Sequence, residues 1–375
     1  MKKTTIAIVA GTLLGAHGAL AEDAKVPSSW TDTVTLKGDF RLRHERIEQE
    51  GKEDRDRQRI RARAGLEAKP SSDVTVGIRL STSQDGDPVS SNQTLGDGFS
   101  RKDVYLDLGY LDWHPEAVKG LSVIGGKMEN PFALVGDLVW DGDLNPEGLA
   151  LKHKVAGDGL DLLLNAGAFS VEERSATTED ALLYGGQVGV KFKSDAAHGI
   201  VAAGYYYYDN LKGFAPVVDP LDGFGNSIVE TVDPVTEEVT AAAYATGFEL
   251  VDLIAEVGAD LGVPAAAYGN FVQNQDADED DTGFMVGLKL GKTKEPGSVD
   301  FNYNYRELEA NAVLGAFSDS DFIGGGTDGK GHKVSVGVQL TKVLKGQLTW
   351  FMNEIGLDGD SKDYDRLQVD VAGKF

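Results

Sequence analysis

The chain has 375 residues, with 60 Asp and Glu against 36 Lys and Arg, a formal net charge of -24 and no cysteine. This balance excludes nucleic acid as a partner, because neutralising phosphate groups requires an excess of Lys and Arg. The absence of cysteine excludes disulfides and a lipid-modified cysteine. With 47 glycines, 11 prolines and 41% apolar residues, the composition is typical of a large β-protein whose strands carry alternating apolar and polar side chains.

The N-terminal segment predicts export. Lysines at positions 2 and 3 precede an apolar run over 6–14, and residues 19–21 are Ala-Leu-Ala, the small-x-small pattern of a cleavage site. We therefore expect a signal peptide over 1–21, cleaved after Ala21, and an N-terminal lead over 22–32. The mature chain would have 354 residues (375 minus 21) and a charge of -26 (-24 minus two lysines). No later stretch offers the ~18 apolar residues of a transmembrane helix.

From residue 33 onward, apolar and polar residues alternate with the period of a β-strand. In the first such segment Leu36, Phe40 and Leu42 alternate with charged residues that include Arg41 and Arg43. We expect sixteen strands within the ranges 34–43, 59–68, 74–81, 104–110, 121–127, 149–154, 160–164, 187–193, 200–209, 244–258, 264–273, 284–290, 299–306, 334–341, 347–354 and 364–375.

The connections between these segments alternate in length. Seven are short, and eight are longer or more polar, at 47–58, 83–102, 128–147, 172–182, 210–242, 274–281, 309–331 and 355–363. This is the pattern of an all-β, transmembrane, antiparallel up-and-down β-barrel over 33–375, with short periplasmic turns and long extracellular loops. The segment 249–261 also fits an amphipathic helix. We favour a strand there, because a helix cannot replace one strand of a closed barrel.

Two motifs carry a resemblance to a known family. The last strand has Leu367, Val369, Val371, Gly373 and the terminal Phe375 on one face, with Tyr364 out of phase. It resembles the C-terminal assembly signal of outer-membrane barrels. Residues 126–132 read Gly-Lys-Met-Glu-Asn-Pro-Phe, and the chain over 33–375 is similar to the Gram-negative porins, most closely to the proteobacterial putative-porin family.

This resemblance implies a water-filled channel in the outer membrane of a Gram-negative bacterium, for passive diffusion of small hydrophilic solutes and ions. A substrate-selective channel with a binding site in the lumen is the alternative. The implied partners are outer-membrane lipid and lipopolysaccharide, the barrel-assembly machinery, for which Phe375 would be the signal, and further copies of the chain in a homotrimer. No nucleic acid partner is expected.

By resemblance, loop 128–147 folds into the barrel and narrows it. The pore-lining candidates are the basic residues of three strands and the acidic residues of this loop: Arg41, Arg43, Arg59, Arg61, Arg63, Arg79, Asp137, Asp141, Asp143 and Glu147. A basic wall facing an acidic loop would set a transverse field that favours solutes whose dipoles align. Alternatively, the arginines are structural partners for Asp39, Glu67 and Asp107 and filter nothing.

Several other patterns are interpreted as structural. The glycines at 324, 326 and 329 match G-x-G-x-x-G without a strand-to-helix context, so we expect a surface loop and no cofactor. The acidic run 276–281 and Asp141-x-Asp143-x-Asn145 are expected to be solvated charge, with calcium bridging of lipopolysaccharide as the alternative and no dedicated metal site. Residues Tyr205 to Tyr208, with Tyr110, Trp113, Trp350 and Tyr364, are candidates for an interfacial aromatic girdle. No G-x-S-x-G or H-E-x-x-H frame supports an enzyme.

Overall fold

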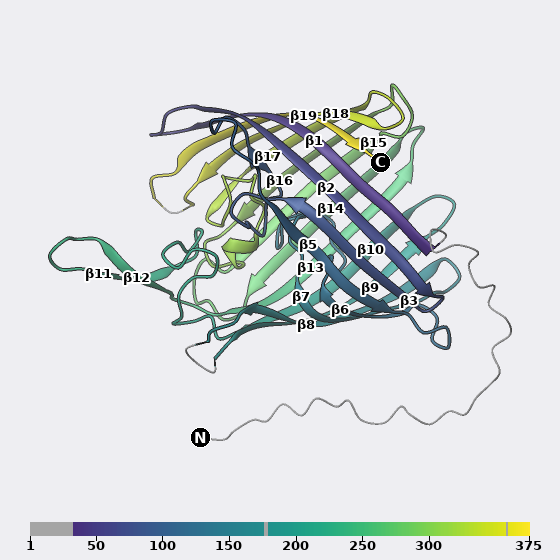
Figure 1. Cartoon of the computed structure of the whole chain (residues 1–375), viewed down its shortest axis with the longest axis horizontal. Coiled ribbons are helices and arrows are strands. Elements are labelled where there is room, and N and C mark those ends of the chain that lie inside the picture. The colour runs from purple at the N-terminus through teal and green to yellow at the C-terminus, as the bar shows by residue number, and fades with distance from the viewer. Residues whose placement is uncertain (1–32, 176–178, 358) are drawn as a thin grey trace, which may run out of the picture.

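A computed structural model describes residues 33–175, 179–357 and 359–375. The predicted signal peptide over 1–21 and the lead over 22–32 lie outside the described residues. Within them, the chain forms one closed antiparallel barrel of sixteen strands (Figure 1). These are β1 Val34–Gln49, β2 Arg55–Ser71, β3 Val74–Thr82, β5 Val104–Trp113, β6 Leu121–Lys127, β7 Glu147–Val155, β8 Leu160–Glu172, β9 Ala181–Lys193, β10 His198–Asp209, β13 Phe248–Asp260, β14 Pro264–Asn274, β15 Thr282–Gly291, β16 Val299–Leu308, β17 Gly329–Gln339, β18 Leu344–Ile355 and β19 Lys362–Lys374.

Pairing between the first and last strands closes the barrel. The register between β1 and β19 runs from Asp39 opposite Lys374 to Gln49 opposite Tyr364. Beyond it, the N–H of Phe375 donates to the carbonyl of Gly38, and the N–H of Gly38 donates to the carbonyl of Phe375, both at 3.0 Å. A closed ladder leaves no barrel strand with an unpaired edge. The predicted up-and-down barrel of sixteen strands is confirmed.

Successive side chains of a barrel strand face the outside and the lumen in turn. On β1, Leu36 and Leu42 are exposed on the outer surface, whereas Arg43 and Glu45 are buried inside. The short strand β4 (Gln93–Thr94) pairs with β2 at Arg59 and Ile60, where β2 extends beyond β3. The long connections gather at one end of the barrel, here called the long-loop end, and the short ones at the short-turn end.

The segment with helical periodicity, 249–261, is a strand. It lies within β13, which pairs along its length with β10 on one side and β14 on the other. Leu250 and Ile254 are buried in the lumen, while Leu253 and Val257 are exposed outside. The sequence pattern looked helical because the lumen face of this strand carries the apolar Leu250 and Ile254 beside Asp252 and Glu256, which weakens the usual contrast between an apolar and a polar face.

The predicted strand 244–258 begins later than expected, because β13 starts at Phe248. Tyr244 instead ends β12 (Val239–Tyr244), which pairs with β11 (Ile228–Val232) in a separate hairpin that lies mostly within the predicted loop 210–242. This hairpin extends away from the barrel at the long-loop end (Figure 1). Residues 239–244 read Val-Thr-Ala-Ala-Ala-Tyr, which does not alternate between apolar and polar residues, so periodicity gave no signal for this hairpin.

Part of the predicted aromatic girdle lies inside the barrel. Tyr205 is exposed on the outer surface, but Tyr206 and Tyr208 are buried in the lumen, because adjacent strand residues face opposite sides. Tyr364 is also buried in the lumen, which explains why it was out of phase with the outer residues of the last strand. Trp113 and Trp350 are exposed on the outer surface, as expected for a girdle.

A bulge changes the face of residues in β5. Opposite β3, Arg79 pairs with Leu108 and Leu80 with Leu106, so Asp107 is an extra residue. The predicted alternation does not continue through an inserted residue. Leu108 is buried, and the ring of Tyr110 lies against Gly77, so the placement of Tyr110 in the girdle was wrong.

Across the described residues, no helix has the length and apolar character needed to cross a membrane.

Candidate functional site

The connection between β6 and β7, residues 128–146, is folded into the barrel. Its two ends meet, because the N–H of Met128 donates to the carbonyl of Pro146 at 2.9 Å. The Asn130 side chain accepts from the N–H of Phe132 at 3.0 Å, which turns the chain at Pro131. Met128, Leu138 and Trp140 are almost fully buried. We call residues 128–147 the inserted loop.

One side of the inserted loop packs on an apolar wall formed by β9, β10 and β13–β15. The Trp140 and Phe132 rings stack with their centroids 5.6 Å apart, and both contact the Tyr206 ring edge to face, at 4.4 and 4.9 Å. The Trp140 Nε1–H donates to the Tyr208 hydroxyl at 3.0 Å. The Gln187 amide binds both the N–H and the carbonyl of Ala133. The two inward tyrosines are therefore the platform on which this loop rests.

The other side of the inserted loop carries carboxylates that bind basic residues of the opposite strands. Asp137 bonds Arg306 of β16 at 2.5 Å and Lys333 of β17 at 2.8 Å. Asp143 lies 3.3 Å from Arg63 and 3.8 Å from Arg61, both on β2. Its other oxygen accepts from the N–H and hydroxyl of Ser91. Glu147 lies at the start of β7 and pairs with Lys127 at 2.7 Å, outside this network.

Asp141 differs from these acids, because no basic side chain of the described residues pairs with it. Its carboxylate accepts from the backbone N–H groups of Asp143 at 2.7 Å and Ser320 at 2.9 Å. Burial raises the pKa of Asp141 well above its usual range, and the nearby carboxylates of Asp319 and Asp143 raise it further. Burial also opposes ionisation of Asp137, but Arg306 and Lys333 outweigh it and lower that pKa.

A second loop, 309–328 between β16 and β17, also enters the barrel, which the sequence analysis did not anticipate. Residues 312–316 and the short η2 (Gly315–Phe317) pack in the apolar core with the inserted loop. Asp319 pairs with Arg306 at 3.1 Å, and Asp321 with Arg43 at 2.9 Å and Arg366 at 2.7 Å. The apolar run Ala-Val-Leu-Gly-Ala-Phe over 312–317 was the available signal, since a solvated loop would not carry it.

The predicted arginines face the lumen and are paired. Arg41 donates a hydrogen bond to the Asn92 side-chain oxygen at 2.6 Å, and Arg43 donates to both carboxylate oxygens of Asp370, at 2.8 and 2.9 Å. Arg61 and Arg63 share Asp39, at 2.9 and 2.8 Å.

The remaining predicted partners are distributed as follows. Arg59 lies 3.7 Å from Glu45, and Arg79 bonds Asp107 at 2.5 Å. The suggested partner Glu67 binds Lys37 instead of an arginine, at 2.8 Å. The structure thus brings Asp143 into contact with the basic strand β2. The basic wall and this acidic residue of the loop do not face each other across an open gap.

Two further arginines, Arg57 and Arg366, complete this network through the buried Glu45. Ion pairs within 4 Å join seven arginines to five carboxylates among the described residues: Arg41, Arg43, Arg57, Arg59, Arg61, Arg63 and Arg366 with Asp39, Glu45, Asp143, Asp321 and Asp370. We call this set the arginine network. It retains an excess of two positive charges (seven minus five), although the whole chain is acidic.

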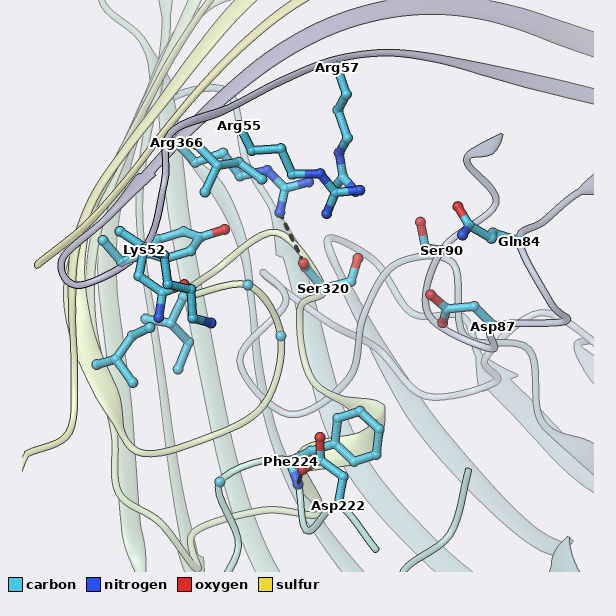
Figure 2. Close-up of a pocket in the computed structure, with 18 of the residues that line it drawn as sticks. Lys52, Arg55, Arg57, Gln84, Asp87, Ser90, Asp222, Phe224, Ser320 and Arg366 are labelled. Carbon is cyan, nitrogen blue, oxygen red and sulfur yellow. Dashed lines mark hydrogen bonds between the residues drawn. The ribbon is translucent and has the colours of Figure 1, made fainter. Parts of the chain in front are cut away.

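At the long-loop end the arginine network borders a pocket of about 780 Å³ (Figure 2). Arg55, Arg57 and Arg366 line one side of it, and Asp222 and Phe224 lie across from these arginines. We call it the vestibule pocket. In the described part of the chain, no group of three or more His, Cys, Asp or Glu side chains is arranged to hold a metal ion.

Comparison with known proteins agrees with this architecture. The model of a family described as putative porin matches residues 46–222 and 232–375. Among solved structures, the chain is similar to Pseudomonas putida OprB, with a TM-score of 0.61 and 12% identity over 92% of this chain and 95% of that one. It is also similar to Salmonella typhi OmpF in complex with daunomycin, with a TM-score of 0.56 and 11% identity over 92% and 99%.

A third similar structure is the trimer form of in-vitro folded OmpT, an outer-membrane protein of Vibrio cholerae, with a TM-score of 0.51 and 13% identity over 92% and 99%. A search of curated proteins found no match. At these identities the solved structures show the fold, whereas the family match covers most of the chain. The chain belongs to the putative porin family and is an outer-membrane β-barrel channel for the diffusion of small solutes.

Proposed function

We propose that the inserted loop sets the width of this channel and that small hydrophilic solutes and ions pass through the part of the lumen that the loop and the arginine network leave open. The observation that carries the proposal is the position of the loop. It is attached by aromatic packing to one wall and by Asp137 and Asp143 to strands of the other. Fixed charges beside a narrow aqueous path bias which solutes enter it.

Shortening the inserted loop tests this proposal. Because Met128 and Pro146 are already hydrogen-bonded, residues 134–141 can be replaced by a short Gly-Ser linker without separating β6 from β7. We expect a higher single-channel conductance in planar bilayers and faster swelling of liposomes in larger sugars. As the matched control, residues 229–243 of the hairpin outside the barrel are replaced in the same way, which should leave both values unchanged. Unchanged conductance in the loop variant would show that the inserted loop does not narrow the solute path.

We further propose that the chain is exported with cleavage after Ala21 and assembles as a homotrimer in contact with outer-membrane lipid and lipopolysaccharide. The trimer form of the similar OmpT supports the oligomeric state by analogy. Mass spectrometry of the purified protein measures the mature N-terminus. Native mass spectrometry measures the number of copies, and a single copy in mild detergent contradicts the trimer.

Phe375 is proposed as the signal for the barrel-assembly machinery. Its backbone forms the last two hydrogen bonds between β19 and β1, and its side chain is exposed. Deleting Phe375 should reduce the amount of assembled, heat-modifiable protein in the outer membrane far more than it changes the conductance of the barrels that form. The substitution Lys374→Gln is the control. Normal assembly of the deletion variant contradicts the signal role.

A further inference from the structure

The vestibule pocket has the size of a small-molecule site, since such sites usually enclose roughly 300–1,000 Å³. It lies where several segments distant in sequence meet. Strand β2 supplies Arg55, Arg57 and Arg59, strand β19 supplies Tyr364 and Arg366, and the long loops supply most of the rest. Figure 2 shows Arg55, Arg57 and Arg366 extending into the space from one side. A molecule entering the barrel from the long-loop end meets these side chains first.

The basic side of the pocket has donors that the protein leaves free. Among the described residues, no carboxylate lies within ion-pair distance of Lys52 or Arg55, and both are exposed. Deeper in the pocket, the Nε groups of Arg59 and Arg366 are buried without a hydrogen-bond acceptor. Arg366 is only 2% exposed and Arg59 only 7%. A buried guanidinium N–H without an acceptor is costly, but these Nε groups have no accessible surface. The cations that a ligand in the pocket can reach are therefore the exposed Lys52 and Arg55.

Carboxylates also line the pocket. Figure 2 shows Asp87 and Asp222 apart from Arg55, Arg57 and Arg366. The other acidic lining residues are Glu53, Asp85 and Asp328, and in the part of the chain that the structure describes no basic side chain pairs with any of the five. The carboxylates of Asp87 and Asp222 are held in position by backbone groups. Asp87 accepts from the N–H of Val89 at 2.9 Å, and Asp222 from the N–H of Phe224 at 2.7 Å. Their free oxygens can receive a cationic group of a ligand.

The two sides together define the charge that a ligand must carry. An anion would be attracted by the arginines but repelled by Asp87 and Asp222. A cation would be attracted by these carboxylates but repelled by the arginines. A molecule with a carboxylate at one end and an ammonium at the other satisfies both. The Phe224 ring, beside Asp222 (Figure 2), offers an apolar surface for the carbon chain between them.

We propose that the vestibule pocket binds dipolar solutes of the amino-acid and short-peptide class before they enter the lumen. This inference rests on the proposed diffusion function and names a solute class for it. Since Lys52 and Arg55 are solvated, each ion pair with the ligand is weak. A weak site suits a channel, because a solute that bound tightly at the entrance would not move on.

Three probes with one carbon skeleton separate the charge requirements. These are 6-aminohexanoate, which is dipolar, hexanoate, which is anionic, and hexylammonium, which is cationic. Titration calorimetry on the detergent-solubilised barrel should show a Kd near 1 mM for 6-aminohexanoate, about -4 kcal/mol. We expect at least about tenfold weaker binding for the other two, a loss of about 1.4 kcal/mol. Equal binding of hexanoate and 6-aminohexanoate overturns the proposal in favour of a simple anion site.

Two double variants assign the sides of the pocket. Lys52→Gln with Arg55→Gln removes the free cations, and Asp87→Asn with Asp222→Asn keeps the oxygens that accept the backbone bonds. Each should weaken binding of 6-aminohexanoate about tenfold. The control, Lys119→Gln with Lys342→Gln, changes two exposed lysines in short turns and should bind normally. Wild-type affinity in either pocket variant overturns the proposal.

The same samples are tested for conductance in planar bilayers, so that the two proposals fail separately. A conducting channel that does not bind 6-aminohexanoate overturns the dipolar site and leaves the diffusion function intact. A barrel that binds the probe but does not conduct overturns the diffusion function and supports the site. Heat-modifiable migration on gels confirms that each variant is folded before it is compared.

Discussion

The two walls that hold the inserted loop differ in the physical basis of their attachment. The apolar wall contributes aromatic rings, in which Trp140 packs against both Phe132 and Tyr206. The charged wall contributes ion pairs, in which Asp137 and Asp143 bind residues of β16, β17 and β2. Burial of an aromatic ring stabilises regardless of salt and pH, whereas an ion pair must first offset the desolvation of its charges. We therefore expect the apolar wall to keep the loop in the barrel and the charged wall to set its position and its response to conditions.

The largest effect is expected from Trp140→Ala, which removes the ring contacts with Phe132 and Tyr206 and the hydrogen bond to Tyr208. Truncating a buried Trp costs about 3–5 kcal/mol, enough to release a loop held mainly by this contact. Limited proteolysis should show new cleavage within 128–147, and conductance should rise and become noisier. Trp113→Ala, on the exposed outer surface, is the control. If proteolysis and conductance stay at wild-type values, the apolar wall is not the main attachment.

A smaller effect is expected from Asp137→Asn on the charged wall. The Arg306 side chain is only 1% exposed, and both Arg306 and Lys333 retain Asp319 as a partner. The loss of loop stability should therefore be about 1–3 kcal/mol. The loop should stay in the barrel but become more accessible to protease than in wild type and less than in Trp140→Ala. Glu147→Gln, whose partner Lys127 lies outside the network, is the matched control. If Asp137→Asn makes the loop more accessible to protease than Trp140→Ala does, the charged wall holds the loop more strongly than the apolar wall.

Changing Arg59, Arg61 and Arg63 together to Ser tests whether the charged wall also selects ions. Removing three positive charges should make the channel more cation-selective, because Asp39, Glu45 and the carboxylates of the inserted loop remain. The reversal potential under a salt gradient measures this. Its shift should shrink as salt increases, since the Debye length falls from ~10 Å at 0.1 M to ~3 Å at 1 M. Ala62→Leu and Ala64→Leu, on the outer face of the same strand, should leave it unchanged. An unaltered reversal potential at low salt places the arginines away from the ion path.

The smallest effect is expected from mild acidification, acting through Asp141. Because its pKa is raised in the folded protein, the folded state binds more protons than the unfolded state between the ordinary carboxyl pKa and the raised value. Stability of the loop should therefore rise as the pH falls through the raised pKa. Asp137 and Asp321, whose pKa values are lowered, lose their contribution only at much lower pH. Burial also raises the pKa of Asp319, whose effect has the same sign. Proteolysis of the loop should slow on mild acidification in wild type, and Asp141→Asn should reduce this dependence. If Asp141→Asn keeps the full wild-type pH dependence, Asp141 is not its cause.

Much of the barrel was predictable because a strand in a closed sheet has only two faces. The alternation of Leu36, Phe40 and Leu42 with Arg41 and Arg43 identified the inner and outer sides of β1 from local sequence alone. Alternating loop lengths gave the antiparallel order, since consecutive strands of such a barrel are neighbours. The assignment failed where one residue changes the phase, at the bulge of Asp107, because an inserted residue leaves no mark on composition.

The sequence by itself determined the strands, their order and which arginines face the lumen, because these depend on a period of two residues. Only the tertiary structure decided what fills the lumen. That loop 309–328 enters the barrel, that Tyr206 and Tyr208 support Trp140, and that Asp143 is neutralised by β2 all depend on surfaces brought together from distant parts of the chain. The vestibule pocket has the same origin. Its free cations and free carboxylates belong to segments far apart in sequence, and only closure of the barrel places them across one cavity.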